Sequence, residues 1–105
     1  MKTKFAPVHP GEILQEEFLI PLGLSQNQLA QHLSVNISRV NEIVRGRRGI
    51  TGNTALRLAR AMNTTPEFWL NLQSAYNLKI TIQKHGEKIT REVQSSGWNK
   101  LHRIE

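Results

Sequence analysis

Apolar residues recur with helical spacing in five segments between residues 9 and 78. The inward-facing positions are Ile13, Leu14 and Phe18; Leu29, Ala30 and Leu33; Ile37, Val40, Ile43 and Val44; Ala55, Leu58, Ala59 and Met62; and Phe68, Trp69, Leu72, Ala75 and Tyr76. Spacings of three and four residues place such side chains on one side of a helix. The pattern predicts five short amphipathic helices that pack around one core.

Punctuating residues set the expected helix boundaries. Ser25 with Gln28 forms a capping box, and Asn36, Thr51 and Thr65 are natural N-caps for the third, fourth and fifth helices. Ile20-Pro21 is expected to end the first helix, because proline restricts the residue before it. Gly46 offers a left-handed cap after the third helix.

Beyond Leu78 the pattern supports two structures. Ile80 and Ile82 alternate with polar residues as in a strand, whereas Leu78, Ile82, His85, Ile89 and Val93 follow helical spacing interrupted by Gly86. The segment is therefore left unassigned, and residues 95–105 are expected to form a loosely held tail. We predict a domain over residues 1–78 and a C-terminal extension over 79–105.

Composition narrows the function classes. The 105 residues suit one domain, and they contain neither cysteine nor aspartate. This excludes disulfides, thiolate nucleophiles, zinc–thiolate sites and a Ser-His-Asp triad. The four histidines lack paired metal-ligand spacing. We therefore expect no catalytic residues, no metal and no cofactor, and a protein that is not an enzyme.

The net charge of +6 favours a polyanionic partner. Residues 25–52 and 79–105 each carry a net +3, from 4 − 1 and 6 − 3. No apolar run approaches the ~18 residues that span a bilayer, and the N-terminus lacks the apolar stretch of a signal peptide. We expect a cytoplasmic protein.

The second and third helices are about three residues apart, which suits the crossing of a helix-turn-helix. In such a unit the second helix enters the major groove, with its first residues against base edges. The base-reading residues are then Asn36, Ile37, Ser38, Arg39 and Glu42, and the phosphate-binding residues are Gln26, Arg45, Arg47 and Arg48. The non-functional alternatives are an ion pair between Arg39 and Glu42 and local packing of Ile37. Separately, Glu16 and Glu17 offer acidic surface to a basic protein partner.

Five helices with this reading pair resemble the lambda-repressor-like, XRE-type DNA-binding fold, so the predicted class is all-α with a C-terminal extension of uncertain structure. HPGEIL at 9–14, GRRGIT at 46–51, ALRLARAM at 55–62 and TPEFWLNLQ at 65–73 together resemble the HigA-type antitoxin family, also described as virulence-associated protein I. The resemblance covers about residues 8 to 78.

The resemblance implies a homodimer that represses its own operon by binding double-stranded operator DNA. It also implies neutralisation of a HigB toxin, a RelE-like ribonuclease that cleaves mRNA on the ribosome. The family's DNA-reading positions fall on Gln26, Asn36, Ser38, Arg39 and Arg47, and its dimer contacts fall around Trp69, Leu72 and Tyr76.

Two positions depart from the family pattern. Ser34 replaces the usual turn glycine, so a left-handed backbone there would cost about 1 kcal/mol. Gly52-Asn53 replaces a Pro-Glu pair and weakens the start of the fourth helix. Other hypotheses are a stand-alone XRE-type regulator without a toxin, and a protein-interaction module that no longer reads DNA. A small hydrolase ranks last, because the sequence shows no nucleophile–base pair.

Overall fold

A computed structural model describes residues 6–98, which form five continuous helices and no strand. The first helix comprises α1 (Pro10–Ile13), a π-helical segment (Leu14–Leu19) and α2 (Ile20–Leu22). It is followed by α3 (Gln26–Leu33), α4 (Ile37–Val44), α5 (Gly52–Met62) and α6 (Pro66–Glu92). The predicted all-α class is confirmed, and the segment after Leu78 is helical.

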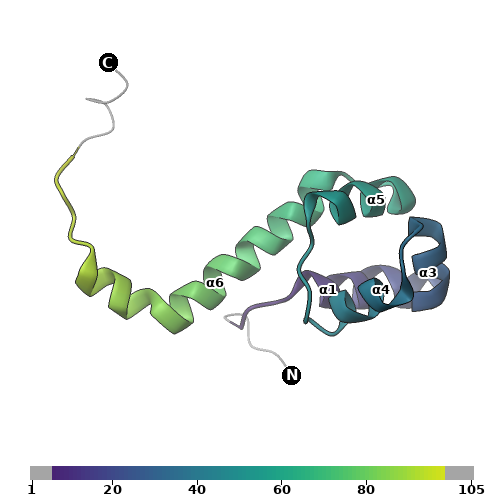
Figure 1. Cartoon of the computed structure of the whole chain (residues 1–105), viewed down its shortest axis with the longest axis horizontal. Coiled ribbons are helices and arrows are strands. Elements are labelled where there is room, and N and C mark those ends of the chain that lie inside the picture. Colours follow the sequence, from purple (N-terminus) through teal and green to yellow (C-terminus); the bar gives the residue numbers. More distant parts are fainter. Residues whose placement is uncertain (1–5, 99–105) are drawn as a thin grey trace, which may run out of the picture.

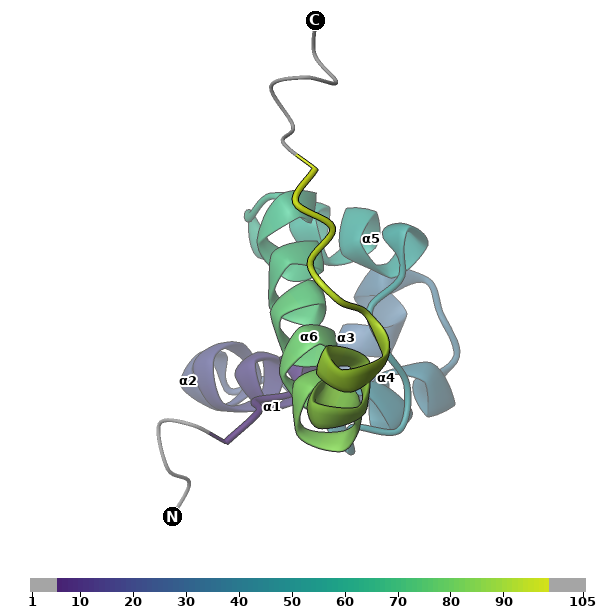
Figure 2. The ribbon, with the colours of Figure 1, turned by 90° about the vertical axis from the view of Figure 1, so that its left-hand side faces the viewer.

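The five helices gather around one apolar core at one end of the molecule (Figure 1). Its buried members are Leu14, Leu19, Leu29, Ala30, Leu33, Val40, Ile43, Ile50, Ala55, Leu58 and Trp69. Figure 2 shows α6 toward the viewer, with the α1–α2 helix on one side and α4 and α5 on the other. Among the residues expected to face inward from α6, Trp69 alone is fully buried, whereas Phe68 and Ala75 are exposed.

The predicted end of the first helix is wrong. The helix continues through Pro21 and ends at Gly23, whose φ of 66° is left-handed. The preceding turn is wide: the Ile20 N–H donates to the Gln15 carbonyl, five residues back. A proline ring in an α-helix collides with the carbonyl four residues earlier, and the wider turn moves that carbonyl aside.

The predicted caps are confirmed. Ser25 Oγ accepts from the Gln28 N–H at 3.0 Å, and the Gln28 side chain accepts from the Ser25 N–H at 2.9 Å. Thr51 and Thr65 accept from the N–H groups of Thr54 and Phe68. Each cap satisfies a backbone donor that the first helical turn leaves unpaired.

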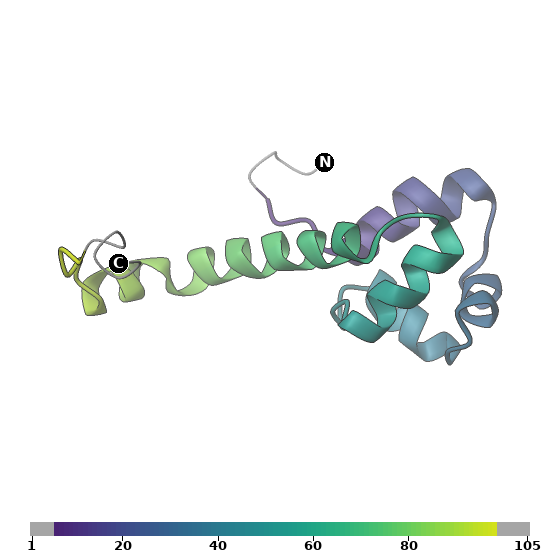
Figure 3. The ribbon, with the colours of Figure 1, turned by 90° about the horizontal axis from the view of Figure 1, so that it is seen from above.

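The last helix extends beyond Leu78, where we predicted that the domain ends. α6 runs without a break past Leu78 and leaves the body (Figure 3). Gly86 lies inside this helix, although glycine costs a helix about 1 kcal/mol relative to alanine. Residues 93–98 form neither helix nor strand, and residues 99–105 of the expected tail lie outside the described part of the chain.

Candidate nucleic-acid interface

Helices α3 and α4 form the predicted helix-turn-helix. Ser34, in the turn, adopts the left-handed conformation at φ 56°, and its N–H donates to the Gln31 carbonyl at 3.1 Å. The Val35 N–H then donates to the Ala30 carbonyl at 3.0 Å. These two bonds close α3 as a Schellman cap and turn the chain into α4. The strain expected at Ser34 is therefore present.

The first turn of α4 presents its side chains to solvent. Asn36 is the N-cap, with its Oδ1 accepting from the Ser38 N–H at 2.8 Å, so its Nδ2 donors are left for a ligand. Ile37 is 46% exposed, so part of its side chain is accessible to a ligand and part is packed against the protein. Ser38 is also exposed, and Arg39 is half-buried.

Arg39 is not paired with Glu42. Its Nη1 donates to Asn53 Oδ1 on α5 at 3.3 Å. The same oxygen accepts from Arg57 Nε at 2.8 Å, and Arg57 Nη1 donates to the Leu33 carbonyl at 2.8 Å. Asn53 therefore holds Arg39 beside the start of α4 and ties α5 to the end of α3.

Asn53 and Arg57 were missed by the sequence reasoning. Their spacing of four residues places both side chains on one helix face, which is the sequence signal for the bond between them. The bond from Asn53 to Arg39 joins residues 14 apart, so no local pattern indicates it.

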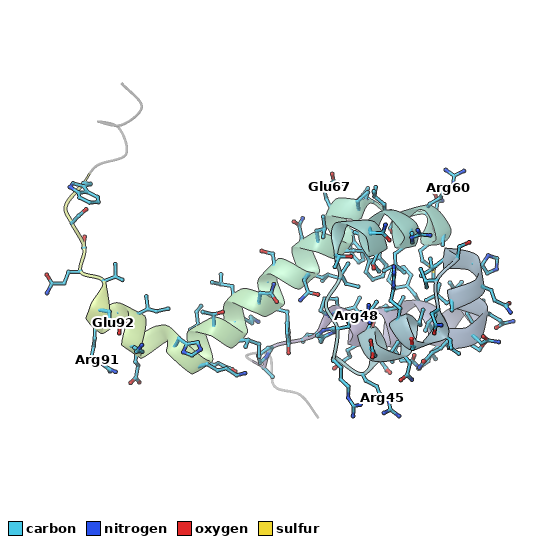
Figure 4. All side chains as sticks on the ribbon, in the orientation of Figure 1. Arg45, Arg48, Arg60, Glu67, Arg91 and Glu92 are labelled. Carbon is cyan, nitrogen blue, oxygen red and sulfur yellow. The ribbon has the colours of Figure 1, made fainter. Side chains whose placement is uncertain are left out.

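Glu42 forms its ion pair with Arg48. Arg48 Nε donates to Glu42 Oε1 at 2.8 Å, and Nη2 lies 2.6 Å from the same oxygen. Arg45 and Arg47 have no such acidic partner within residues 6–98, and both are exposed. Arg45 points away from the body below α4 in Figure 4. The loop after α4 thus offers two free cations and one paired cation.

Gln26 is engaged as well. Its Oε1 accepts from Asn41 Nδ2 at 3.1 Å, which links the start of α3 to the middle of α4. Its amide donors are left for a phosphate oxygen near the helix N-terminus.

Two contacts from other elements fix α4 and its loop. A Cβ on Gly11 would lie 1.8 Å from the Ile43 carbonyl oxygen, so α1 packs directly against the backbone of α4. The Ile50 N–H donates to Gln73 Oε1 on α6 at 2.6 Å. Gln73 is the last residue of the TPEFWLNLQ element. Its bond to Ile50 holds the end of the arginine loop, residues 45–51, which joins α4 to α5.

The residues predicted for dimer contact differ in exposure. Trp69 is 0% exposed, and its Nε1 donates to Thr64 Oγ1 at 2.8 Å. Its side chain therefore belongs to the core and has no surface to give a second protomer. Leu72 is half-buried, and Tyr76 packs edge-on against His9 with ring centroids 4.9 Å apart.

No group of three or more metal-ligating side chains occurs within residues 6–98. In the same residues no helix is both long and apolar enough to cross a bilayer.

Comparison with known proteins shows the family to which this chain belongs. The helix-turn-helix family model matches residues 15–69. Virulence-associated protein I of Dichelobacter nodosus is 54% identical over 82 residues, which is 78% of this chain and 76% of that protein.

Two solved structures share the fold over most of this chain. The addiction module antidote protein of the HigA family from Coxiella burnetii has 54% identity and a TM-score of 0.81, covering 85% of this chain and 97% of that one. The Pseudomonas aeruginosa antitoxin HigA, solved with the higBA promoter, has 43% identity and a TM-score of 0.85, covering 87% and 99%.

Proposed function

Because this chain belongs to the XRE-type helix-turn-helix family of virulence-associated protein I and the HigA antitoxins, we propose that it is a DNA-binding antitoxin and autorepressor. The observation that carries the proposal is the exposed first turn of α4 beside the free cations Arg45 and Arg47. A relative of the same fold has been solved with promoter DNA, which supports it.

In this proposal the first turn of α4 enters the major groove. Arg39 pairs with guanine, Ser38 and the Asn36 amide donate to base edges or phosphate, and Ile37 touches a thymine methyl. Glu42 reads a cytosine amino group only if it leaves Arg48, so it is the residue whose contact requires a local exchange of partners.

Phosphate binding falls to Gln26, Arg45, Arg47 and Arg48. Arg45 and Arg47 contribute at once, since neither must break an ion pair. Each neutralised phosphate adds affinity that falls with salt and does not depend on sequence. Because Arg48 keeps Glu42 as a partner, Arg48 contributes less to phosphate binding than Arg45 or Arg47.

The finer parts of the proposal concern the partners. We propose a cytoplasmic homodimer whose α4 helices read half-sites about 34 Å apart, and a HigB-like toxin that it neutralises. The native DNA just upstream should then encode a strongly basic chain of about one hundred residues. Absence of that neighbour favours the stand-alone regulator.

Two arginine substitutions test DNA reading. Arg39→Ala should weaken specific operator binding by ~1–3 kcal/mol and relax base preference, whereas Arg47→Ala should mainly lower the salt dependence. Arg60→Ala is the control, because Arg60 is exposed on α5 at the opposite edge from Arg45 (Figure 4). Operator affinity is measured by titration at several salt concentrations for the native chain and the three variants.

If both variants bound the operator as tightly as Arg60→Ala, the assignment of α4 would be wrong. Toxin neutralisation is tested separately by co-expression with the upstream gene. Growth should recover when this chain is present, and the two chains should co-purify. Retained DNA binding without rescue would leave a stand-alone regulator.

A further inference from the structure

Two arginines share one acceptor at the start of α5. The exposed side chain of Asn53 accepts through Oδ1 from Arg57 Nε at 2.8 Å and from Arg39 Nη1 at 3.3 Å. An amide oxygen has two lone pairs, so these two donors use its whole capacity and decide which way the amide faces. Asn53 thereby joins α5 to Arg39 on α4.

Arg57 fixes the position of that oxygen. Its Nη1 donates at 2.8 Å to the carbonyl of Leu33, at the end of α3, where carbonyl groups lack partners within the helix. Arg57 follows Asn53 by four residues on α5, which brings the two side chains to the same helix face. Since α3, α4 and α5 lie at one end of the molecule (Figure 1), the chain of bonds crosses all three helices. Asn53 Oδ1 is thus held from α3 as well as from α5.

The bond to Arg39 is the weaker of the two. At 3.3 Å it is longer than the usual range of about 2.7–3.2 Å, and its acceptor is neutral. A carboxylate at the same place would form a charge-assisted bond, which is about twice as strong. The neutral amide therefore leaves Arg39 its full charge and allows it to exchange this acceptor for another.

Arg39 keeps donors for DNA. Asn53 engages only Nη1, and within residues 6–98 no carboxylate forms an ion pair with Arg39. An arginine reads guanine by donating in parallel to O6 and N7, and Nε and Nη2 of Arg39 have no acceptor in the described chain. A side chain that is already held beside the first turn of α4 loses less freedom when it docks, so the correct base is bound more tightly.

We propose that Asn53 is a specificity-determining residue for DNA reading, which acts by positioning Arg39 and does not itself touch DNA. The proposal rests on the DNA-binding function proposed above. Asn53 sets the direction from which the Arg39 guanidinium enters the groove, and Arg57 keeps the Asn53 amide in that orientation. Asn53 thus governs how strongly the base pair under Arg39 is preferred, and it leaves the affinity for other DNA unchanged.

Two other roles for Asn53 give different results. If Asn53 only stabilised α5 through Arg57, its loss would lower the unfolding midpoint without changing base preference. If Asn53 contacted a base itself, its loss would change the preference at a base pair that Arg39 does not read. The preference at each base pair therefore separates the three roles.

Binding to the promoter DNA of the chain's own gene is compared with binding to duplexes that each carry one base-pair change. Arg39→Ala identifies the base pair that Arg39 reads. Asn53→Ala should lower operator affinity about three- to tenfold, the effect of losing one hydrogen bond, and should lose preference at that same base pair. Affinity for non-operator DNA should stay within about twofold, because phosphate contacts are unchanged. Circular dichroism checks that the variants keep their helices.

A double-mutant cycle tests whether Asn53 acts through Arg39. In the Arg39→Ala background, Asn53→Ala should cost no further operator affinity, because the group that Asn53 positions is gone. Two effects that add in full would show that Asn53 contacts DNA independently of Arg39, and they would overturn the proposal.

Asn53→Asp tests the importance of a neutral acceptor. The carboxylate should hold Arg39 and lower the ratio of operator affinity to non-operator affinity about tenfold. Gln83→Glu is the matched control, since it makes the same change of charge at an exposed position in the part of α6 that extends away from α1–α5 (Figure 3). A general repulsion of DNA lowers both affinities, so Gln83→Glu should leave the ratio unchanged. An unchanged ratio in Asn53→Asp as well would overturn the positioning role.

Failure of this inference is distinct from failure of the proposed function. A native chain that does not bind its promoter, or an Arg39→Ala variant that binds it like the native chain, would refute reading by α4 and this inference with it. If Arg39→Ala lost operator affinity while Asn53→Ala kept the native base preference, the role of Asn53 alone would be refuted and the proposed function would stand.

Discussion

Gly11→Ala should destabilise the domain, although alanine is the better helix former. The added Cβ would lie 1.8 Å from the Ile43 carbonyl oxygen, 2.6 Å from its carbonyl carbon and 3.0 Å from Val44 Cα. All three atoms belong to the backbone of α4, so no side chain can rotate away. Relief requires α1 and α4 to separate by more than 1 Å.

The magnitude follows from two opposing terms. Overpacking in a tight interface costs about 1–3 kcal/mol, and a clash with backbone belongs at the upper end. Replacing a helical glycine by alanine returns at most ~1 kcal/mol, the value for a helix interior. We expect a net loss of about 2 kcal/mol, equivalent to a fall in Tm of roughly 8–16 °C for a domain of this size.

Urea unfolding of Gly11→Ala and Gly52→Ala measures this difference. Gly52 also lies in the first turn of a helix, but a Cβ there meets nothing within 4 Å. Gly52→Ala should therefore stabilise by about 0.4–1 kcal/mol. If Gly11→Ala left the unfolding midpoint unchanged or raised it as Gly52→Ala should, the close packing of α1 on α4 would be refuted.

Two further predictions concern Ser34 and His9. Ser34→Gly should stabilise by about 1 kcal/mol in urea unfolding, since Ser34 has a φ of 56°; an unchanged midpoint would show that the turn carries no strain. Burial lowers the pKa of His9 below 6.5, and its Nδ1 accepts from the Gly11 N–H at 2.9 Å, so the neutral ring is the form that caps α1. The unfolded chain then takes up the proton at higher pH than the folded chain. The contribution of His9 is therefore full above about pH 6.5 and is lost as pH falls through the lowered folded pKa. His9→Asn keeps a capping side chain without a titrating group, so the urea midpoint should depend less on pH between 7.5 and 5 than in the native chain; equal dependence would exclude His9 as the cause.

Helix boundaries set by local chemistry were predictable from the sequence. Ser25, Asn36, Thr51 and Thr65 cap the helices as expected, because a cap depends on residues two or three positions away. The continuation of the first helix past Pro21 was not predictable, since it depends on the wide turn that precedes the proline. The helix beyond Leu78 stayed open because its apolar spacing fits two structures.

The candidate site was also predictable only in part. The positions on α4 and in the arginine loop follow from the helix-turn-helix pattern. Their partners do not, because the bonds from Arg39 to Asn53 and from Ile50 to Gln73 join residues 14 and 23 apart. Trp69 shows the converse: the resemblance placed it at a dimer contact, whereas the packing of α6 buries it in the core.

The long-range bonds have a consequence for how the proposed interface would work. α4 is held by Gly11 from α1 and by Gln26 from α3, and Asn53 on α5 positions Arg39. A helix held from three elements gives up little further freedom when it docks, so less binding energy is spent on ordering it. The Glu42–Arg48 pair is different, because it must open before either residue contacts DNA fully. Preformed affinity therefore rests on the first turn of α4 with Arg45 and Arg47, and the Glu42–Arg48 pair is where a local rearrangement would accompany specific binding.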